Sequence, residues 1–218
     1  MLDTAVPPQK HKPRWTRRKD FRPKEILEAA LKLFTERGFA ATRLEDVAKQ
    51  AGVTKGTLYL YFTNKEELFK AVMRESVFPA MAQAQDLVEN YSGPSVNLMI
   101  SLIKYYWSQV STTKLGSILK LIIAESGNFP ELAQFYMNEF VLPSRKLAAR
   151  ALQRGIDSGE LRACDPEFIT RMIAAPVMME AVWEYSLRRY EPHPVNQEAF
   201  LNAHIDLILH GICKNPKS

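Results

Sequence analysis

The stretch from residue 42 to residue 65, TRLEDVAKQAGVTKGTLYLYFTNK, constrains this chain most, because it fits two short amphipathic helices joined by a tight turn. In its first half, apolar residues recur at helical spacing: Leu44, Val47, Ala48 and Ala51. Gly52 then ends that helix, since glycine takes the left-handed conformation without steric cost. Thr54 follows, and its side-chain oxygen can cap a second helix that starts at Lys55 or Gly56. The pattern predicts a helix-turn-helix unit.

The second of these helices is predicted to have an apolar inward face and a polar outward face. Leu58 and Phe62 are four residues apart and are predicted to point inward. The outward face is predicted to present Thr54, Lys55, Thr57, Tyr59 and Tyr61. Such a face suits a polyanion, because it offers one cation and several hydroxyl donors to phosphate oxygens or base edges, with no carboxylate to repel them. We therefore expect it to bind nucleic acid.

Residues 46–69, with the pattern D-V-A-x-x-A-G-V-T-K-G-T-L-Y-x-Y-F-x-N-K-E-x-L-F, resemble the signature of the TetR family of one-component bacterial transcriptional regulators. The likeness runs through the whole stretch with few gaps. The alternative is a small helical hairpin inside a larger bundle. The resemblance implies an N-terminal three-helix DNA-binding domain that contains the helix-turn-helix, followed by a C-terminal helical bundle for ligand sensing and dimerisation.

In most of the rest of the 218 residues, apolar residues also recur at helical spacing, and no long stretch alternates apolar and polar residues. We therefore expect an all-α protein. No run of about eighteen uncharged apolar residues is present, and the basic, proline-containing N-terminus lacks an apolar segment. These features predict no membrane span, no secretory signal and a cytoplasmic location. Cys164 and Cys213 belong to no Cys-x-x-Cys or Cys/His pattern, which argues against a disulfide framework or a zinc site.

The net charge of +5 is unevenly distributed. Residues 1–74 carry 16 Lys and Arg against 9 Asp and Glu, whereas the remainder carries 13 against 15. Positive charge thus accompanies the helix-turn-helix, as nucleic-acid binding requires. Residues 1–20 are predicted to form a flexible basic tail, or on a bolder interpretation an arm that adds DNA contacts. The expected domains are this tail, a DNA-binding domain over residues 21–68 and a ligand-binding and dimerisation domain over residues 69–213.

The remaining helices are predicted from apolar spacing and from caps. A helix over residues 23–37 is predicted to complete the core of the DNA-binding domain. A cap at residues 63–64 begins a long fourth helix, which either kinks or ends near Pro79. Two later helices must accommodate an internal proline, Pro143 and Pro176. The later helices are predicted over residues 94–110, 114–125, 130–158, 166–189 and 196–212.

The C-terminal half is larger than a DNA-binding module needs for support, and two uses are predicted. One is dimerisation, since two copies on a palindrome read more base pairs than one. The resemblance implies that the last two helices form the homodimer interface. The other use is a pocket for a small hydrophobic effector. Its candidate residues are Tyr105, Trp107, Phe135, Tyr136, Met179 and Trp183. The alternative is that these side chains only fill the core.

The resemblance also implies an allosteric mechanism, in which effector binding moves the two DNA-reading units of a dimer out of register with successive major grooves. Repression at a palindromic operator in double-stranded DNA is the usual mode of the family. We expect Lys55, Thr57 and Tyr59 to contact bases. The residues expected to hold phosphates are Thr42, Arg43, Gly56, Tyr61 and Lys65, and Thr54 joins them as a DNA-binding residue.

Two other classes of function are weighed against this one. An enzyme is disfavoured, because the histidines form no His-x-x-x-His pair and no catalytic Ser/His/Asp or Cys/His set or glycine-rich phosphate loop can be assembled. His204 and His210 are instead expected at the surface or at an interface, and no cofactor or metal is expected. The closer alternative is a protein of the same fold that binds DNA for architecture, or docks a protein partner, and senses no small molecule.

Overall fold

The computed structural model describes residues 22–193 and 195–213, so the expected basic tail lies outside the described residues. Every regular element in this range is helical, which confirms the all-α prediction. The elements are α1 (Arg22–Arg37), α2 (Leu44–Gln50), α3 (Lys55–Tyr61), α4 (Lys65–Asn90), α5 (Ser95–Thr112), α6 (Leu115–Glu125), α7 (Pro130–Tyr136), a π-helical turn (Met137–Val141), α8 (Leu142–Asp157), α9 (Pro166–Glu184), a 3-10 turn (Arg188–Tyr190) and α10 (Gln197–Ile212).

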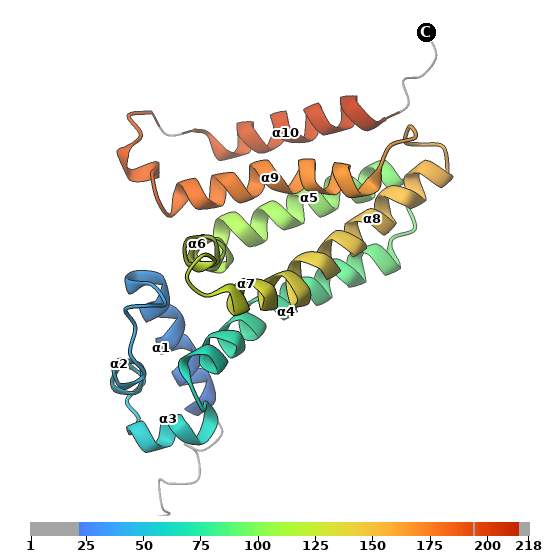
Figure 1. Cartoon of the computed structure of the whole chain (residues 1–218). Coiled ribbons are helices and arrows are strands. Elements are labelled where there is room, and N and C mark those ends of the chain that lie inside the picture. The colour runs from blue at the N-terminus through green and yellow to red at the C-terminus, as the bar shows by residue number, and fades with distance from the viewer. Residues whose placement is uncertain (1–21, 194, 214–218) are drawn as a thin grey trace, which may run out of the picture.

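The first three helices form one end of the molecule, the head, which comprises residues 22–64 (Figure 1). Gly38 and Gly52 have φ values of +85° and +66°, so the two glycines end α1 and α2 as predicted. The side chains of Thr54 and Asn64 cap α3 and α4, where each accepts a hydrogen bond from a backbone N–H, at 3.1 and 2.8 Å. Local residues therefore set where each helix of the helix-turn-helix begins and ends.

Phe39, which follows the turn at Gly38, lies at the centre of the head's core. Its ring is fully buried and meets Phe69 of α4 edge-to-face, with ring centres 5.2 Å apart. It meets Phe129, in the loop between α6 and α7, at 4.7 Å. The core of the head is thus continuous with that of the remaining helices α5 to α10, the body.

α4 joins the head to the body as a single helix (Figure 1). It continues through Pro79, although proline removes one helical hydrogen bond, so the helix does not end there as one of the two predictions had it. α9 likewise continues through Pro176. The domain boundary expected between residues 68 and 69 falls inside α4, so this helix belongs to both parts.

The helix expected over residues 130–158 is divided by the π-helical turn. Pro143 follows directly, at the start of α8, and the wide turn accommodates its ring and its missing N–H. Glu139 within the turn accepts two hydrogen bonds from the Arg74 guanidinium of α4, at 2.9 and 3.1 Å. The turn is therefore fixed to the helix that enters the head.

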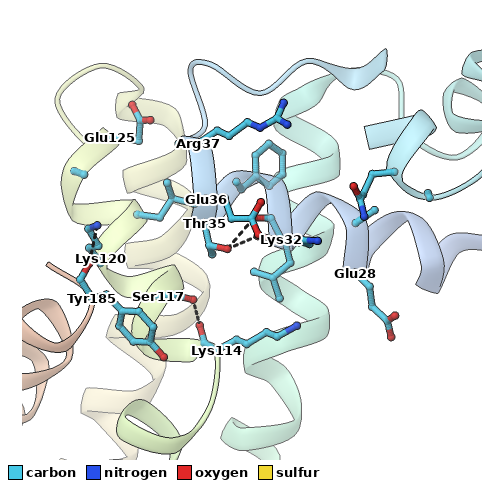
Figure 2. A pocket seen from close by; sticks show the side chains of 18 of the residues that line it. Glu28, Lys32, Thr35, Glu36, Arg37, Lys114, Ser117, Lys120, Glu125 and Tyr185 are labelled. Carbon is cyan, nitrogen blue, oxygen red and sulfur yellow. Dashed lines mark hydrogen bonds between the residues drawn. The ribbon is translucent and has the colours of Figure 1, made fainter. Parts of the chain in front are cut away.

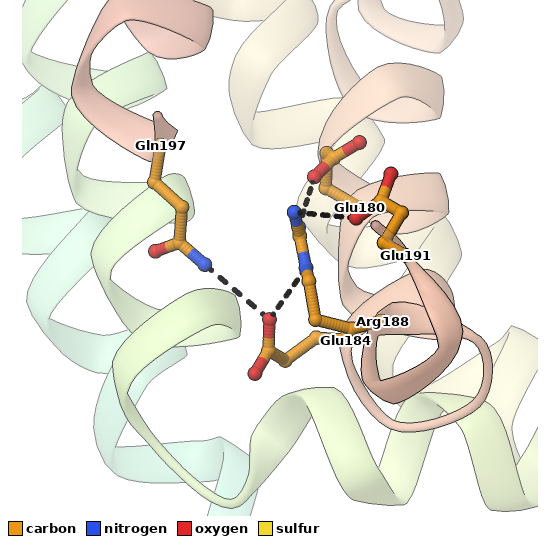
Figure 3. A network of polar contacts seen from close by, with 5 residues as sticks. All are labelled: Glu180, Glu184, Arg188, Glu191 and Gln197. Atoms are coloured by element: carbon orange, nitrogen blue, oxygen red, sulfur yellow. Dashed lines mark hydrogen bonds and ion pairs between the residues drawn. The ribbon is translucent and has the colours of Figure 1, made fainter. Parts of the chain in front are cut away.

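α9 ends at Glu184, earlier than the expected Arg189. Beyond this end, Arg188 turns back and forms ion pairs with Glu180, Glu184 and Glu191 at 2.6, 3.1 and 3.2 Å (Figure 3). Because its guanidinium is largely buried, these pairs hold the residues after α9 against the last turns of that helix.

α10 lies on the outside of the body, beyond α9 (Figure 1). Nε2 of His204 is 3.0 Å from the Ile173 carbonyl oxygen of α9, and His204 is buried. The expectation that His204 lies at the surface or at an interface is therefore wrong, because its ring ties α10 to α9. His210 is exposed, as expected.

Candidate nucleic-acid interface

The outward face of α3 is exposed at the end of the molecule farthest from α10 (Figure 1). Leu58 is fully buried, as its spacing predicts, whereas Tyr59 and Tyr61 have exposed fractions of 42% and 41%. The hydroxyls of Thr54 and Thr57 share a hydrogen bond of 2.9 Å on the same side of the helix. The polar face predicted from the sequence is therefore present on a helix that the core of the head holds in place.

Lys55 on this face is already paired in the free protein. Its Nζ lies 2.6 Å from Oε1 of Glu45 in α2 and 5.8 Å from the centre of the Tyr59 ring. The hydrogen bond and the charge attraction raise the pKa of Lys55 and lower the pKa of Glu45. The prediction of a face without carboxylates is thus wrong for the folded head, because α2 brings one to it.

Thr42 is not placed to hold a phosphate. Its exposed fraction is 1%, and its hydroxyl donates to the Gly38 carbonyl at 2.7 Å and lies 3.3 Å from the Leu33 carbonyl. The hydroxyl thereby gives the Gly38 carbonyl, just beyond the end of α1, a hydrogen-bond partner. The expected phosphate contact of this side chain is wrong. Arg43, the next residue, is exposed and stays a predicted phosphate contact.

Lys65 begins α4, but its ammonium group points back at the turn between α1 and α2. Nζ donates to the carbonyls of Phe39 and Ala40 at 2.8 and 3.0 Å and lies 4.5 Å from the centre of the Phe39 ring. Partial burial lowers the pKa of Lys65. Two of its three N–H donors are engaged, which leaves one for the predicted phosphate contact.

Glu125, the last residue of α6, holds the same turn from the side of the body. Its Oε1 accepts hydrogen bonds from the N–H groups of Phe39 and Ala40 at 3.0 and 3.3 Å. Lys65 therefore binds the carbonyls of these two residues while Glu125 binds their N–H groups. Sequence reasoning missed Glu125, since 85 residues separate it from Ala40 and no local pattern marks it.

Comparison with known families accounts for both parts of the chain. Residues 26–72 match the family described as "Bacterial regulatory proteins, tetR family", and residues 99–188 match "Tetracyclin repressor-like, C-terminal domain". A relative from Bacillus subtilis (strain 168), the uncharacterized HTH-type transcriptional regulator YdeS, is 30% identical over 155 residues, which cover 71% of this chain and 75% of YdeS. The chain belongs to the TetR family. It is a transcriptional regulator with a DNA-binding helix-turn-helix.

Two further TetR-fold proteins cover most of the chain. The HTH-type transcriptional repressor KstR2 of Mycobacterium tuberculosis (strain CDC 1551 / Oshkosh) is 27% identical over 199 residues, which cover 87% of this chain and 92% of KstR2. The crystal structure of the transcriptional regulator FadR from Bacillus subtilis in complex with stearoyl-CoA has a TM-score of 0.73 at 24% identity, and the match covers 86% of this chain and 98% of FadR. This likeness shows a shared fold. None of the described helices is both long and apolar enough to cross a membrane.

The residues expected to line the effector pocket of this TetR-family protein have different environments in the structure. The Tyr105 hydroxyl donates to the Ala80 carbonyl of α4 at 2.9 Å, so it ties α5 to α4. The centre of the Phe135 ring lies 4.8 Å from Cζ of Arg74, which also belongs to α4. Met179 has an exposed fraction of 59%, so its side chain points away from the core of the body and the expected pocket role is wrong for it.

Trp107, Tyr136 and Trp183 are buried enough to line such a pocket. Trp107 stacks on Phe200 of α10 with ring centres 5.6 Å apart. Burial raises the pKa of Tyr136 to about 12, and burial together with the nearby Tyr136 also raises the pKa of Tyr106. The indole N–H of Trp183 is buried and has no hydrogen-bond partner among the described residues, which is rare for a buried donor.

The space beside Trp107 is small in this structure. The cavity next to Trp107 has a volume of about 10 Å³, room for about one water molecule. An effector bound there must therefore separate the helices around Trp107. The sequence cannot reveal this closure, because it depends on how α5, α9 and α10 pack.

A much larger hollow lies between the head and the body, where α1 faces α6 (Figure 2). Its volume is about 1140 Å³, and it is open to solvent. Acidic and basic side chains alternate around it without converging on one point: Glu28, Lys32, Glu36, Lys114 and Lys120. Beside this cleft, the last residue of α6 is bonded to the turn after α1.

Proposed function

We propose that this protein is a homodimeric TetR-type repressor that binds a palindromic operator through α3 and leaves it when a small hydrophobic effector enters the body. One observation carries the proposal: α3 turns Lys55, Tyr59 and Tyr61 to the solvent while Leu58 anchors it in the core. A short helix held in this way, with a cation and hydroxyls on its outer face, fits the major groove of DNA.

In the proposed complex, the base-contacting residues are Lys55, Thr57 and Tyr59, as the sequence predicts. Phosphates are held by Arg43, by Tyr61, by the remaining donor of Lys65 and by the backbone N–H of Gly56, with Thr54 beside them. Lys55 reaches DNA only after leaving Glu45, at 2.6 Å in the free protein. Binding therefore depends on the DNA sequence. At a site that offers Lys55 no hydrogen-bond acceptor, the ion pair with Glu45 is broken and nothing replaces it.

The proposed dimer interface is the outer surface of α9 and α10. On α9, three apolar side chains at helical spacing are each more than half exposed: Phe168, Met172 and Met179. On α10, Leu207 has an exposed fraction of 72%. These exposed apolar side chains support an interface here, and twofold pairing would cover the same residues on both subunits.

The proposed effector is small and hydrophobic, and its site lies around Trp107, Tyr136 and Trp183 in the body. The aromatic character of these three side chains and the unpaired indole N–H of Trp183 support this placement. The FadR structure contains stearoyl-CoA, which supports a ligand with a long apolar chain for this fold. Because the cavity must open for entry, effector binding shifts the helices of the body and, through Glu125, the turn that belongs to the head.

The alternative is a TetR-fold protein with an architectural or protein-partner role and no effector. The closed packing around Trp107 favours it. Selection of duplexes from a random pool by the full chain, followed by titration with stearoyl-CoA and a panel of uncharged hydrophobic compounds, separates the two. Enrichment of one palindrome that a compound releases supports the repressor. Uniform retention of many sequences, with no release by any compound, supports the alternative.

A further inference from the structure

Leu60 is the most exposed of the large apolar side chains described, with an exposed fraction of 84%. It lies on α3, two residues after the buried Leu58, which places it about 200° around the helix and so opposite the core. No prediction from the sequence used this residue. An isobutyl group held in water at this position adds nothing to the packing of the head, and it is accessible to whatever α3 binds.

Gly56 lies one helical turn before Leu60 on the same outward side. Its backbone is ordinary helix, because positive φ values occur only at Gly38, Gly52 and Gly159 among the described residues. A Cβ built at Gly56 would approach no atom closer than 3.9 Å, the Thr54 hydroxyl oxygen. The fold therefore does not require a glycine here, although an exposed glycine costs a helix about 1 kcal/mol relative to alanine.

Together these residues give the outermost line of α3 an apolar character, with Thr57 and Tyr61 on one side of it and Lys55 and Tyr59 on the other. A phosphate offers nothing to a leucine, and neither do the polar edges of guanine, cytosine and adenine. The C5-methyl group of thymine is the one apolar group in the floor of the major groove. The apolar stripe of α9 and α10 is at the opposite end of the molecule, so a dimer formed there leaves Leu60 uncovered (Figure 1).

We propose that Leu60 contacts the C5-methyl group of a thymine in each half-site of the operator, and that Gly56 lets α3 approach the groove closely enough for this contact. The inference rests on the proposed DNA-binding function and adds a preference for thymine at one symmetric pair of positions. It also gives α3 a contact that reads the base by shape, beside the hydrogen bonds of its polar residues.

Uracil tests the contact directly, since it pairs like thymine and lacks only the methyl group. The probe is the operator obtained by selection, with each thymine replaced in turn by uracil in both half-sites, titrated with the full chain. At one symmetric pair of positions, we expect the wild-type affinity to fall about four-fold per half-site. This factor corresponds to the free energy of burying one methyl group. With Leu60→Ala, the same replacement should change the affinity by less than about 1.5-fold.

Two variants make the test specific. Leu142→Ala removes another half-exposed leucine, on α8, and should keep the full wild-type response to uracil. Gly56→Ala should fold with unchanged or higher thermal stability and bind the operator at least about ten-fold more weakly, because its Cβ holds α3 away from the bases. A wild-type protein that is indifferent to uracil at every position overturns the inference, and so does an equal loss in wild type and Leu60→Ala. A selection that returns no shared sequence overturns the proposed function as well.

Discussion

The hydroxyl of Thr42 and the ammonium group of Lys65 close the turn between α1 and α2 from its two sides. Both residues belong to a stretch whose pattern indicates DNA binding, yet their partners are backbone carbonyls of the same chain. A pattern of residue types identifies groups that can meet a phosphate. It does not show which of them the fold has already engaged, because the carbonyls of Phe39 and Ala40 carry no signature in the sequence.

Thr42→Val should destabilise the head without weakening its DNA contacts. The variant keeps the shape of the side chain but leaves the Gly38 and Leu33 carbonyls without the hydroxyl, which costs about 1–3 kcal/mol for buried groups. Urea denaturation measures the loss, and a titration with the selected operator below the transition measures affinity. Thr42→Ser, which keeps the hydroxyl, should recover most of the stability. Full stability combined with weaker operator binding would restore the phosphate role.

Glu45→Gln should increase binding to DNA of random sequence. The substitution removes the charge that holds Lys55 at 2.6 Å and so releases one cation toward phosphates. The affinity at low salt should rise several-fold, and the slope of log K against log salt should steepen by about 0.9. Fluorescence anisotropy with a random duplex over a range of salt measures both quantities. Glu131→Gln, at an exposed carboxylate on α7, is the matched control, and an identical slope for the two variants would refute the role given to Glu45.

At the scale of the elements, the helix-turn-helix is predictable because its limits are local. Gly52 takes a left-handed conformation, and Thr54 and Asn64 cap the helices that follow them. Residues next to one another in the chain decide these features. The exposed face of α3 follows from the same information, since burial of Leu58 fixes which residues point outward.

Other element boundaries depend on side-chain contacts that no local pattern predicts. α9 ends at Glu184 where Arg188 turns back to three carboxylates, one of them eight residues earlier (Figure 3). The π-helical turn is fixed by an ion pair between Glu139 and Arg74, 65 residues apart. The pocket residues are a second example. The aromatic residues predicted a pocket near Trp107, but they did not predict that the helices around it pack too closely to leave one.

Glu125→Ala should loosen the turn between α1 and α2 while leaving the helices intact. The N–H groups of Phe39 and Ala40 lose a charged acceptor, and such a bond contributes about 1.5–3 kcal/mol. Amide hydrogen exchange of these two residues should accelerate at least about ten-fold, as NMR can measure. Glu125→Gln keeps a carbonyl oxygen and should have an intermediate effect. Exchange rates equal to wild type in the alanine variant would show that α6 does not hold the head.

At the scale of the whole molecule, the proposed operator binding requires two heads at a fixed separation, since a single α3 reads only a few base pairs. α4 runs unbroken from the head into the body, and Glu125 gives a second connection from α6, so the position of the head follows that of the body. The exposed apolar stripe of α9 and α10 lies at the far end from α3 (Figure 1). Dimerisation there would set the distance between the two heads without covering either.

Leu207→Glu should convert the protein to a monomer. A charge in the centre of an apolar interface is left without a partner on both subunits, which costs several kcal/mol per dimer. Sedimentation velocity should show a mass near 24.9 kDa for the variant and twice that for wild type. Operator affinity should fall at least about 100-fold while the helical content stays the same. Leu142→Glu, on the exposed surface of α8, is the control. If Leu207→Glu still forms a dimer as stable as that of the wild type, the interface lies elsewhere.

The central claim is that two copies of α3, placed by twofold pairing of the body, read one operator. A hydroxyl-radical footprint of the full chain on its selected operator measures this arrangement in a single experiment. We expect two protected segments on the same side of the duplex, related by a dyad and separated by about one helical turn or a multiple of it. A single protected segment, or continuous protection without a dyad, would contradict it.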